Sequence, residues 1–169
     1  MSRGDIQVIG VSAGAHPFRV AASATRGYAG EPINSLAART AGAADVNTVV
    51  VLTDAKPVIG TDNFIGIAEK NMKVDSTGTV VAQKLGVVVP IPNVTRMRGK
   101  AKTAANVDTD AELLAILHDE VLFDLTSGVY TIDDTAAANT SGLEIVDGIP
   151  SKGTLDVVVD ARAMRKEVA

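Results

Sequence analysis

Short runs of β-branched and apolar residues, each ended by turn-forming residues, recur from Asn47 onward and constrain the fold most strongly. Val, Ile and Thr fit the pleated surface of a sheet, whereas Gly, Pro, Asn and Asp favour turns. Ser127-Gly128 is a two-residue hairpin signal, and Pro90 and Pro92 end a run or confine it to a sheet edge. The pattern predicts a mainly β fold. The runs lie at residues 48–53, 64–68, 79–84, 87–89, 94–102, 121–126, 129–133 and 155–163.

One convincing helix interrupts the predicted strands. Thr109 and Glu112 have the spacing of a capping box, in which each residue satisfies a free backbone N–H of the other. Apolar residues follow at helical spacing, and they are Leu113, Leu114, Ile116 and Leu117. We expect a short helix that ends near His118, where an imidazole lies favourably beside the last carbonyls.

Residues 10–45 differ from the rest of the chain. This stretch holds eleven Ala and five Gly, and its few large apolar residues include Phe18, Tyr28 and Leu36. Such a segment cannot bury enough apolar surface by itself to offset the entropy lost on ordering. We therefore predict an extended N-terminal arm over residues 1–45, with Phe18, Tyr28 and Leu36 as candidate contacts to a partner, and a β-rich domain over residues 46–169.

Charge is segregated along the sequence although the net charge is only −4. Arg96, Arg98, Lys100 and Lys102, here named the basic strip, alternate with uncharged residues and so share one face of a strand. Residues 103–151 hold ten acids and no Lys or Arg. The basic strip has three interpretations: a solvated or edge-protecting face, a contact with acidic neighbouring chains, or a nucleic-acid surface. The third is the weakest, because no aromatic stacking platform lies within the strip.

Composition excludes several classes of chemistry. The chain has no Cys, so it has no disulfide, thiolate metal site or thiol nucleophile, and two distant His residues offer little for zinc. We expect no cofactor and no metal. No apolar run reaches the length of a membrane span, and the first residues do not resemble a secretory signal.

One sequence motif suggests an enzyme. Gly10-Val-Ser12-Ala-Gly14 matches the G-x-S-x-G pattern that presents a nucleophilic serine on a strand-to-helix turn in α/β-hydrolases. Pro17 obstructs the helix that should follow Ser12, and the predicted strands do not alternate with helices. A chance match within an Ala- and Gly-rich stretch is the favoured interpretation.

Several segments carry a family resemblance: Phe123–Asp133, Gly142–Asp147, Gly153–Val159, and Phe64–Ala68 leading to Gly78–Val81. Over about residues 46–165 the chain resembles the head decoration, or capsid cement, proteins of tailed bacteriophages. The resemblance implies a small β-barrel or β-tulip-like domain, commonly trimeric, that binds the outside of the major capsid shell. Terminal arms that reach neighbouring subunits are common in that family, which offers no catalytic residues.

These observations lead to one functional hypothesis and two alternatives. We expect a non-enzymatic structural virion protein on the outer capsid surface, assembled in the host cytoplasm. Its expected partners are the major capsid protein and further copies of itself, with no direct nucleic-acid or membrane contact. The basic strip is the candidate contact of the domain. The alternatives are a small serine hydrolase that uses Ser12 and an adhesin module of a virion surface.

Overall fold

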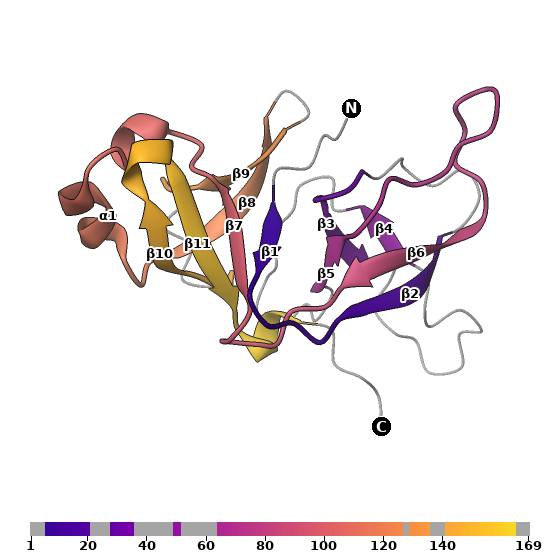
Figure 1. Cartoon of the computed structure of the whole chain (residues 1–169), viewed down its shortest axis with the longest axis horizontal. Helices are drawn as coiled ribbons and strands as arrows, with labels where there is room; N and C mark the ends of the chain where they lie inside the picture. Colours follow the sequence, from indigo (N-terminus) through magenta and orange to yellow (C-terminus); the bar gives the residue numbers. More distant parts are fainter. Residues whose placement is uncertain are drawn as a thin grey trace.

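The computed structural model describes residues 6–20, 28–35, 49–51, 64–126, 129–135 and 141–164 of the chain. Two antiparallel sheets and one short α-helix make up this part of the molecule, which confirms the mainly β prediction. Figure 1 shows the first sheet on the left and the second on the right, with strand β1 between them. Among the described residues, no helix is long and apolar enough to cross a membrane.

The first sheet has the strand order β1-β7-β11-β10-β8-β9. Its core is rich in aliphatic residues and also takes in Phe123 and Tyr130. The sheet consists of β1 (Gln7–Ile9), β7 (Arg96–Lys100), β8 (Glu120–Thr126), β9 (Val129–Asp133), β10 (Leu143–Ile149) and β11 (Thr154–Val159).

The second sheet has the order β2-β6-β5-β3-β4 and encloses a smaller core around Ile33, Leu85 and Val87. Phe64 and Ile67 of β5 belong to the first core, so the two sheets share packing. The strands are β2 (Ala15–Val20), β3 (Pro32–Ser35), β4 (Val49–Val51), β5 (Phe64–Ala68) and β6 (Gln83–Val88).

The predicted hairpin and helix are both present. β8 and β9 pair with Thr126 opposite Val129, the register of a two-residue connection. Helix α1 spans Asp110–Ile116 behind the capping box of Thr109 and Glu112. Leu114 is 70% exposed, whereas the other three apolar residues of the helical pattern pack against the first core. Short 3-10 turns lie at η1 (Ala104–Asn106), η2 (Pro150–Lys152) and η3 (Ala161–Ala163).

The predicted runs 79–84 and 87–89 do not form two separate strands. β6 begins at Gln83 and runs through Gly86 to Val88, so it takes in only the end of the first run. Of the earlier residues of that run, Val80 forms an isolated bridge with Val74. A Cβ on Gly86 would lie 2.5 Å from the Glu69 carboxylate, so the small residue serves the close approach of a side chain and not a turn. β6 ends at Val88, directly before the Pro-containing segment, as predicted.

The first sheet curls without closing. Ala101, just past β7, forms an isolated bridge with Ile132 of β9, and Lys102 N–H donates to the Ile132 carbonyl at 2.8 Å. β7 and β9 share no continuous ladder, and the strand pairings of the described residues close no barrel.

The described parts of residues 1–45 correct the prediction of a separate arm. β1 pairs with β7, β2 with β6, and β3 with β5. Backbone ladders to the later strands, together with buried Ile6, Val20 and Ile33, hold this stretch in both sheets. A segment of this composition could not order by itself, and its described parts are ordered because they pair with strands of their own chain.

Candidate functional site

Strand β7 places the basic strip as its alternation predicts. Met97 is fully buried, Gly99 and Ala101 are also buried, and the four cations lie on the opposite face. Met97 and Ala101 belong to the first core. The charged face of β7 is therefore the outer face of the first sheet.

Acids of the same sheet neutralise the two arginines of the strip. Arg98 Nε and Nη2 donate to the two carboxylate oxygens of Asp156 at 2.6 and 2.7 Å. Arg96 Nη1 lies 2.7 Å from Asp147 Oδ2 and 3.8 Å from Asp156 Oδ2. The Asp156 side chain is only 1% exposed, because it lies beneath the arginine groups. The hydrogen bond to Asp156 raises the pKa of Arg98, so this guanidinium stays charged.

Lys102 is also held within the chain. Its Nζ lies 2.7 Å from Asp133 Oδ2 and 3.4 Å from Asp124 Oδ2. The hydrogen bond to Asp133 raises the pKa of Lys102. Burial raises the pKa of Asp133, but hydrogen bonds from Lys102 and Thr135 outweigh this effect and leave that pKa below its usual value. The acidic stretch of the sequence thus supplies partners for the basic strip of the same chain.

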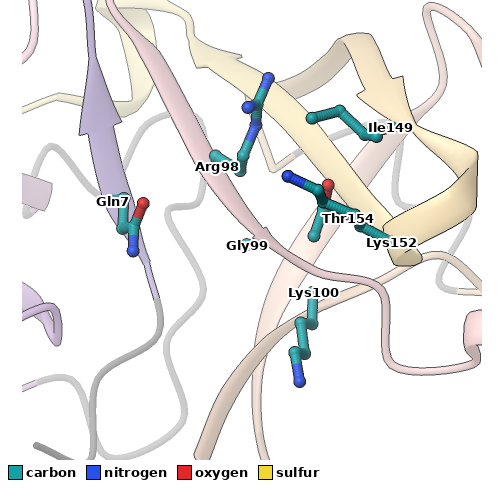
Figure 2. Close-up of a pocket in the computed structure, with 7 residues that line it drawn as sticks. All are labelled: Gln7, Arg98, Gly99, Lys100, Ile149, Lys152 and Thr154. Atoms are coloured by element: carbon teal, nitrogen blue, oxygen red, sulfur yellow. The ribbon is translucent and has the colours of Figure 1, made fainter.

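Lys100 is different from the other three cations. Within the described ranges it forms no ion pair, and its side chain is exposed. It lines a pocket of about 270 Å³ on the outer face of the first sheet (Figure 2). The pocket is lined by Gln7, Arg98, Gly99, Lys100, Ile149, Lys152 and Thr154.

Sequence reasoning missed Lys152, the second cation of this pocket without an ion pair in the described part of the chain. Lys152 ends the 3-10 turn η2, and Gly153 after it has a φ of 58°, which glycine adopts without strain. Thr154 then lies opposite Lys100 in the ladder of β7 and β11. The available signal was that Lys152 is the first cation after the basic strip.

The aromatic and aliphatic candidates of residues 1–45 do not join this site. Phe18 lies in β2, half-buried against the second core. Tyr28 is half-buried before β3, and its backbone N–H donates to Glu31 Oε2 at 2.9 Å. Leu36 lies outside the described residues.

The geometry around Ser12 argues against a nucleophile elbow. Ser12 lies in the connection from β1 to β2, so a strand follows it and not a helix. Its Oγ accepts from Gly14 N–H at 3.2 Å, and the His16 ring lies 3.0 Å from the Ala13 carbonyl oxygen. Gly10 and Gly14 have positive φ angles of 81° and 89°, so both glycines of the motif serve the turn.

The second histidine lies beyond the helix end. His118 adopts a φ of 70°, and its Nδ1 lies 2.6 Å from Glu144 Oε1 of β10. It therefore contacts a carboxylate of the sheet. Within the described ranges, no three His, Asp or Glu side chains are grouped so that they could hold a metal ion.

No protein-family model and no curated protein sequence matches this chain. The pocket beside Lys100, the neutralised arginines and the sheet that carries them are therefore the basis for assigning a function.

Proposed function

We propose that this chain is a structural virion subunit that binds the outer surface of a tailed-bacteriophage capsid and stabilises the shell of major capsid protein. The proposal combines the family resemblance of residues 46–165 with the charge of the outer sheet face. It assigns the chain no catalytic step and no cofactor. Association with further copies of the chain, as a trimer, is part of the same proposal.

The charge that remains on the outer sheet face supports a binding role. Arg96, Arg98 and Lys102 are paired with acids of their own chain. Lys100 and Lys152 keep their charge available, and they lie on one pocket. An acidic surface of a neighbouring chain fits such a face, and a shell that repeats the contact many times binds tightly through individually weak contacts.

The finer fold proposed here is a β-tulip-like domain, in which a curled sheet approaches a barrel. The bridge between Ala101 and Ile132 supports it, because it brings the last strand of the sheet next to the end of β7. Phe64 and Ile67 of β5 pack in the first core, so packing joins the two sheets. A body whose two sheets are joined in this way suits a protein that ties neighbouring capsid subunits together.

The position of β1, β2 and β3 changes where the capsid contact is expected. Because these strands belong to the sheets, the contact is proposed for the folded outer face and not for an N-terminal tether. Deleting residues 1–40 would remove all three strands from the sheets. A loss of capsid binding by that variant would therefore reflect a loss of folding and would not locate the contact.

The decisive experiment mixes the purified chain with empty heads of its phage that lack it and measures occupancy by co-sedimentation and electron microscopy. We expect saturable binding in a fixed ratio to the capsid protein, and heads that resist heat better when occupied. The double variant Lys100→Gln/Lys152→Gln should bind more weakly and lose part of the salt dependence. Lys84→Gln, an exposed lysine of the second sheet, is the matched control.

Three results would contradict the proposal. Heads that neither bind the chain nor gain stability would reject the capsid role. Labelling by a fluorophosphonate that depends on Ser12 would support the hydrolase. Specific binding of the isolated chain to a host glycan, without binding to heads, would support the adhesin.

A further inference from the structure

The pocket beside β7 contains positive charge that its own walls do not neutralise. Arg98, Lys100 and Lys152 line it, and no carboxylate does. Asp156 neutralises Arg98, which leaves the two lysines without an ion pair among the residues that the structure describes. Charges of one sign on a shared pocket repel one another and favour a bound counter-charge.

Thr154 also lines the pocket, but its hydroxyl oxygen lies behind the pocket surface. Thr154 Oγ1 is buried and has no partner in the described part of the chain, although Thr154 lines the pocket. A buried hydroxyl loses its bonds to water, and leaving it unsatisfied costs free energy. A ligand in the pocket does not reach this buried oxygen, so Thr154 contributes to the shape of the wall and not a hydrogen bond.

Backbone contacts fix the walls of the pocket. Thr154 pairs with Lys100, and Gln7 of β1 pairs with Arg98, so three adjacent strands carry lining residues. Ala101 N–H donates to the Gly153 carbonyl at 2.9 Å, and a Cβ on Gly153 would lie 3.0 Å from the Ala104 Cβ. The turn that holds Lys152 is therefore tied to the end of β7, so the backbone of the pocket needs little ordering when a ligand binds.

The size of the pocket limits the ligand. Sites for drug-sized molecules enclose roughly 300–1,000 Å³. This pocket encloses about 270 Å³, so it suits a small anion or the charged end of a longer chain. In Figure 2 Arg98 and Lys100 project in opposite directions along β7, with the Thr154 hydroxyl on the neighbouring strand. Ile149 adds an apolar wall beside these polar groups.

We propose that this pocket is a binding site for a small oxyanion group, a carboxylate or a phosphate, held by Lys100 and Lys152. The group belongs either to a free ion or to an acidic chain. This proposal does not rest on the capsid role, because it concerns the isolated protein.

The test follows backbone amide signals of the isotope-labelled full chain by NMR during titration with inorganic phosphate, succinate or a short poly-glutamate peptide. Ionic strength is kept constant with sodium chloride. We expect saturable shifts at Gly99, Gly153 and Thr154, with Lys100→Gln and Lys152→Gln each weakening binding about tenfold. Lys84→Gln should bind as the wild type does.

Tighter binding of the peptide than of succinate would assign the site to an acidic chain. Saturation by the free ions alone would assign it to a free ion.

Thr154→Val separates binding from folding. The substitution keeps the shape of the side chain and removes the unsatisfied hydroxyl, so the free protein should be as stable as the wild type or more stable. Anion binding should stay as in the wild type, because both lysines of the pocket remain. The proposal is overturned if the shifts rise linearly with concentration, if chloride alone reproduces them, or if both lysine variants bind as the wild type does.

Discussion

Asp156 is the residue on which the charges of the outer sheet face depend. It lies in a strand of Leu and Val residues, and its side chain is buried beneath Arg98 and Arg96. A buried carboxylate is stable only when it is paired and hydrogen-bonded, and here the two-point contact with Arg98 supplies both. The same contact removes Arg98 from the cations that a partner could use.

Replacement of this carboxylate should destabilise the protein. In Asp156→Asn the amide cannot accept both hydrogen bonds of Arg98, and the positive charge loses its partner. Because the Arg98 side chain is 29% exposed, solvent compensates part of the loss, and we expect a decrease of about 2 kcal/mol in the free energy of unfolding. Urea denaturation at neutral pH measures it. The control Asp110→Asn, at an exposed helix position, should change stability by less than about 0.5 kcal/mol, and equal effects of the two variants would contradict this account.

The Asp147 carboxylate should make stability depend on pH. The backbone N–H of Gly148 and the Arg96 guanidinium lower the pKa of Asp147 below 3.8. A lowered folded-state pKa adds stability above the unfolded-state pKa, and this stability is lost as the pH falls through the folded-state value. We therefore expect Asp147→Asn to be less stable than the wild type at pH 7, and the two stabilities to converge as the pH falls below the ordinary carboxyl pKa of about 4. Denaturation curves from neutral pH to below that pKa test it, and a difference that does not change with pH would contradict it.

At the scale of elements, two glycines show how closely the strands of the second sheet approach other groups. A Cβ on Gly66 of β5 would overlap the backbone carbonyl of Val88 in β6. A Cβ on Gly86 would meet only the end of the Glu69 side chain, which is exposed and can rotate away. The backbone contact cannot yield without moving a strand.

The two glycines should therefore respond differently to the same substitution. We expect Gly66→Ala to lower the free energy of unfolding by about 2–3 kcal/mol, in the range found for overpacked cores, and Gly86→Ala to lower it by less than about 1 kcal/mol. Thermal and chemical denaturation of both variants measure the difference. A Gly66→Ala protein as stable as Gly86→Ala would show that a methyl group fits between Gly66 and the Val88 carbonyl.

At the scale of the whole molecule, β5 connects the two cores. Phe64 and Ile67 pack in the first core, and Ile65 and Ala68 of the same strand pack in the second. The ring centroids of Phe64 and Phe123 are 6.2 Å apart, within the range of aromatic contacts. A strand shared by two cores couples the stability of one sheet to that of the other.

We therefore expect the two sheets to unfold together. The chain has two tyrosines, of which Tyr130 lies in the first core and Tyr28 beside β3. The variants Tyr28→Phe and Tyr130→Phe each leave one tyrosine as a fluorescent reporter. In each variant the fluorescence transition should coincide with the far-ultraviolet circular dichroism transition, which reports on both sheets. Separate midpoints in either variant would show that the sheets unfold independently.

The sequence alone determined the elements whose signals are local. β8, β9 and α1 follow from β-branched runs, a two-residue hairpin and a capping box, and each of these features acts within a few residues. The alternation of β7 also predicted which of its side chains would be buried. The capsid role and the trimer remain predictions, because they concern contacts with other chains.

Only the tertiary structure decided which strands pair and which charged side chains form ion pairs. β1, β2 and β3 have weak local signals and are held by backbone ladders to strands far along the chain, so composition suggested an arm where the structure has sheets. Likewise, the sequence showed a basic strip and an acidic stretch, but not that Asp156, Asp147 and Asp133 lie against it. Strand register brought Asp156 and Asp147 to the arginines, because a ladder aligns residues that no sequence spacing relates. The bridge of Ala101 with Ile132 brought Asp133 to Lys102, and Lys100 and Lys152 came to line one pocket.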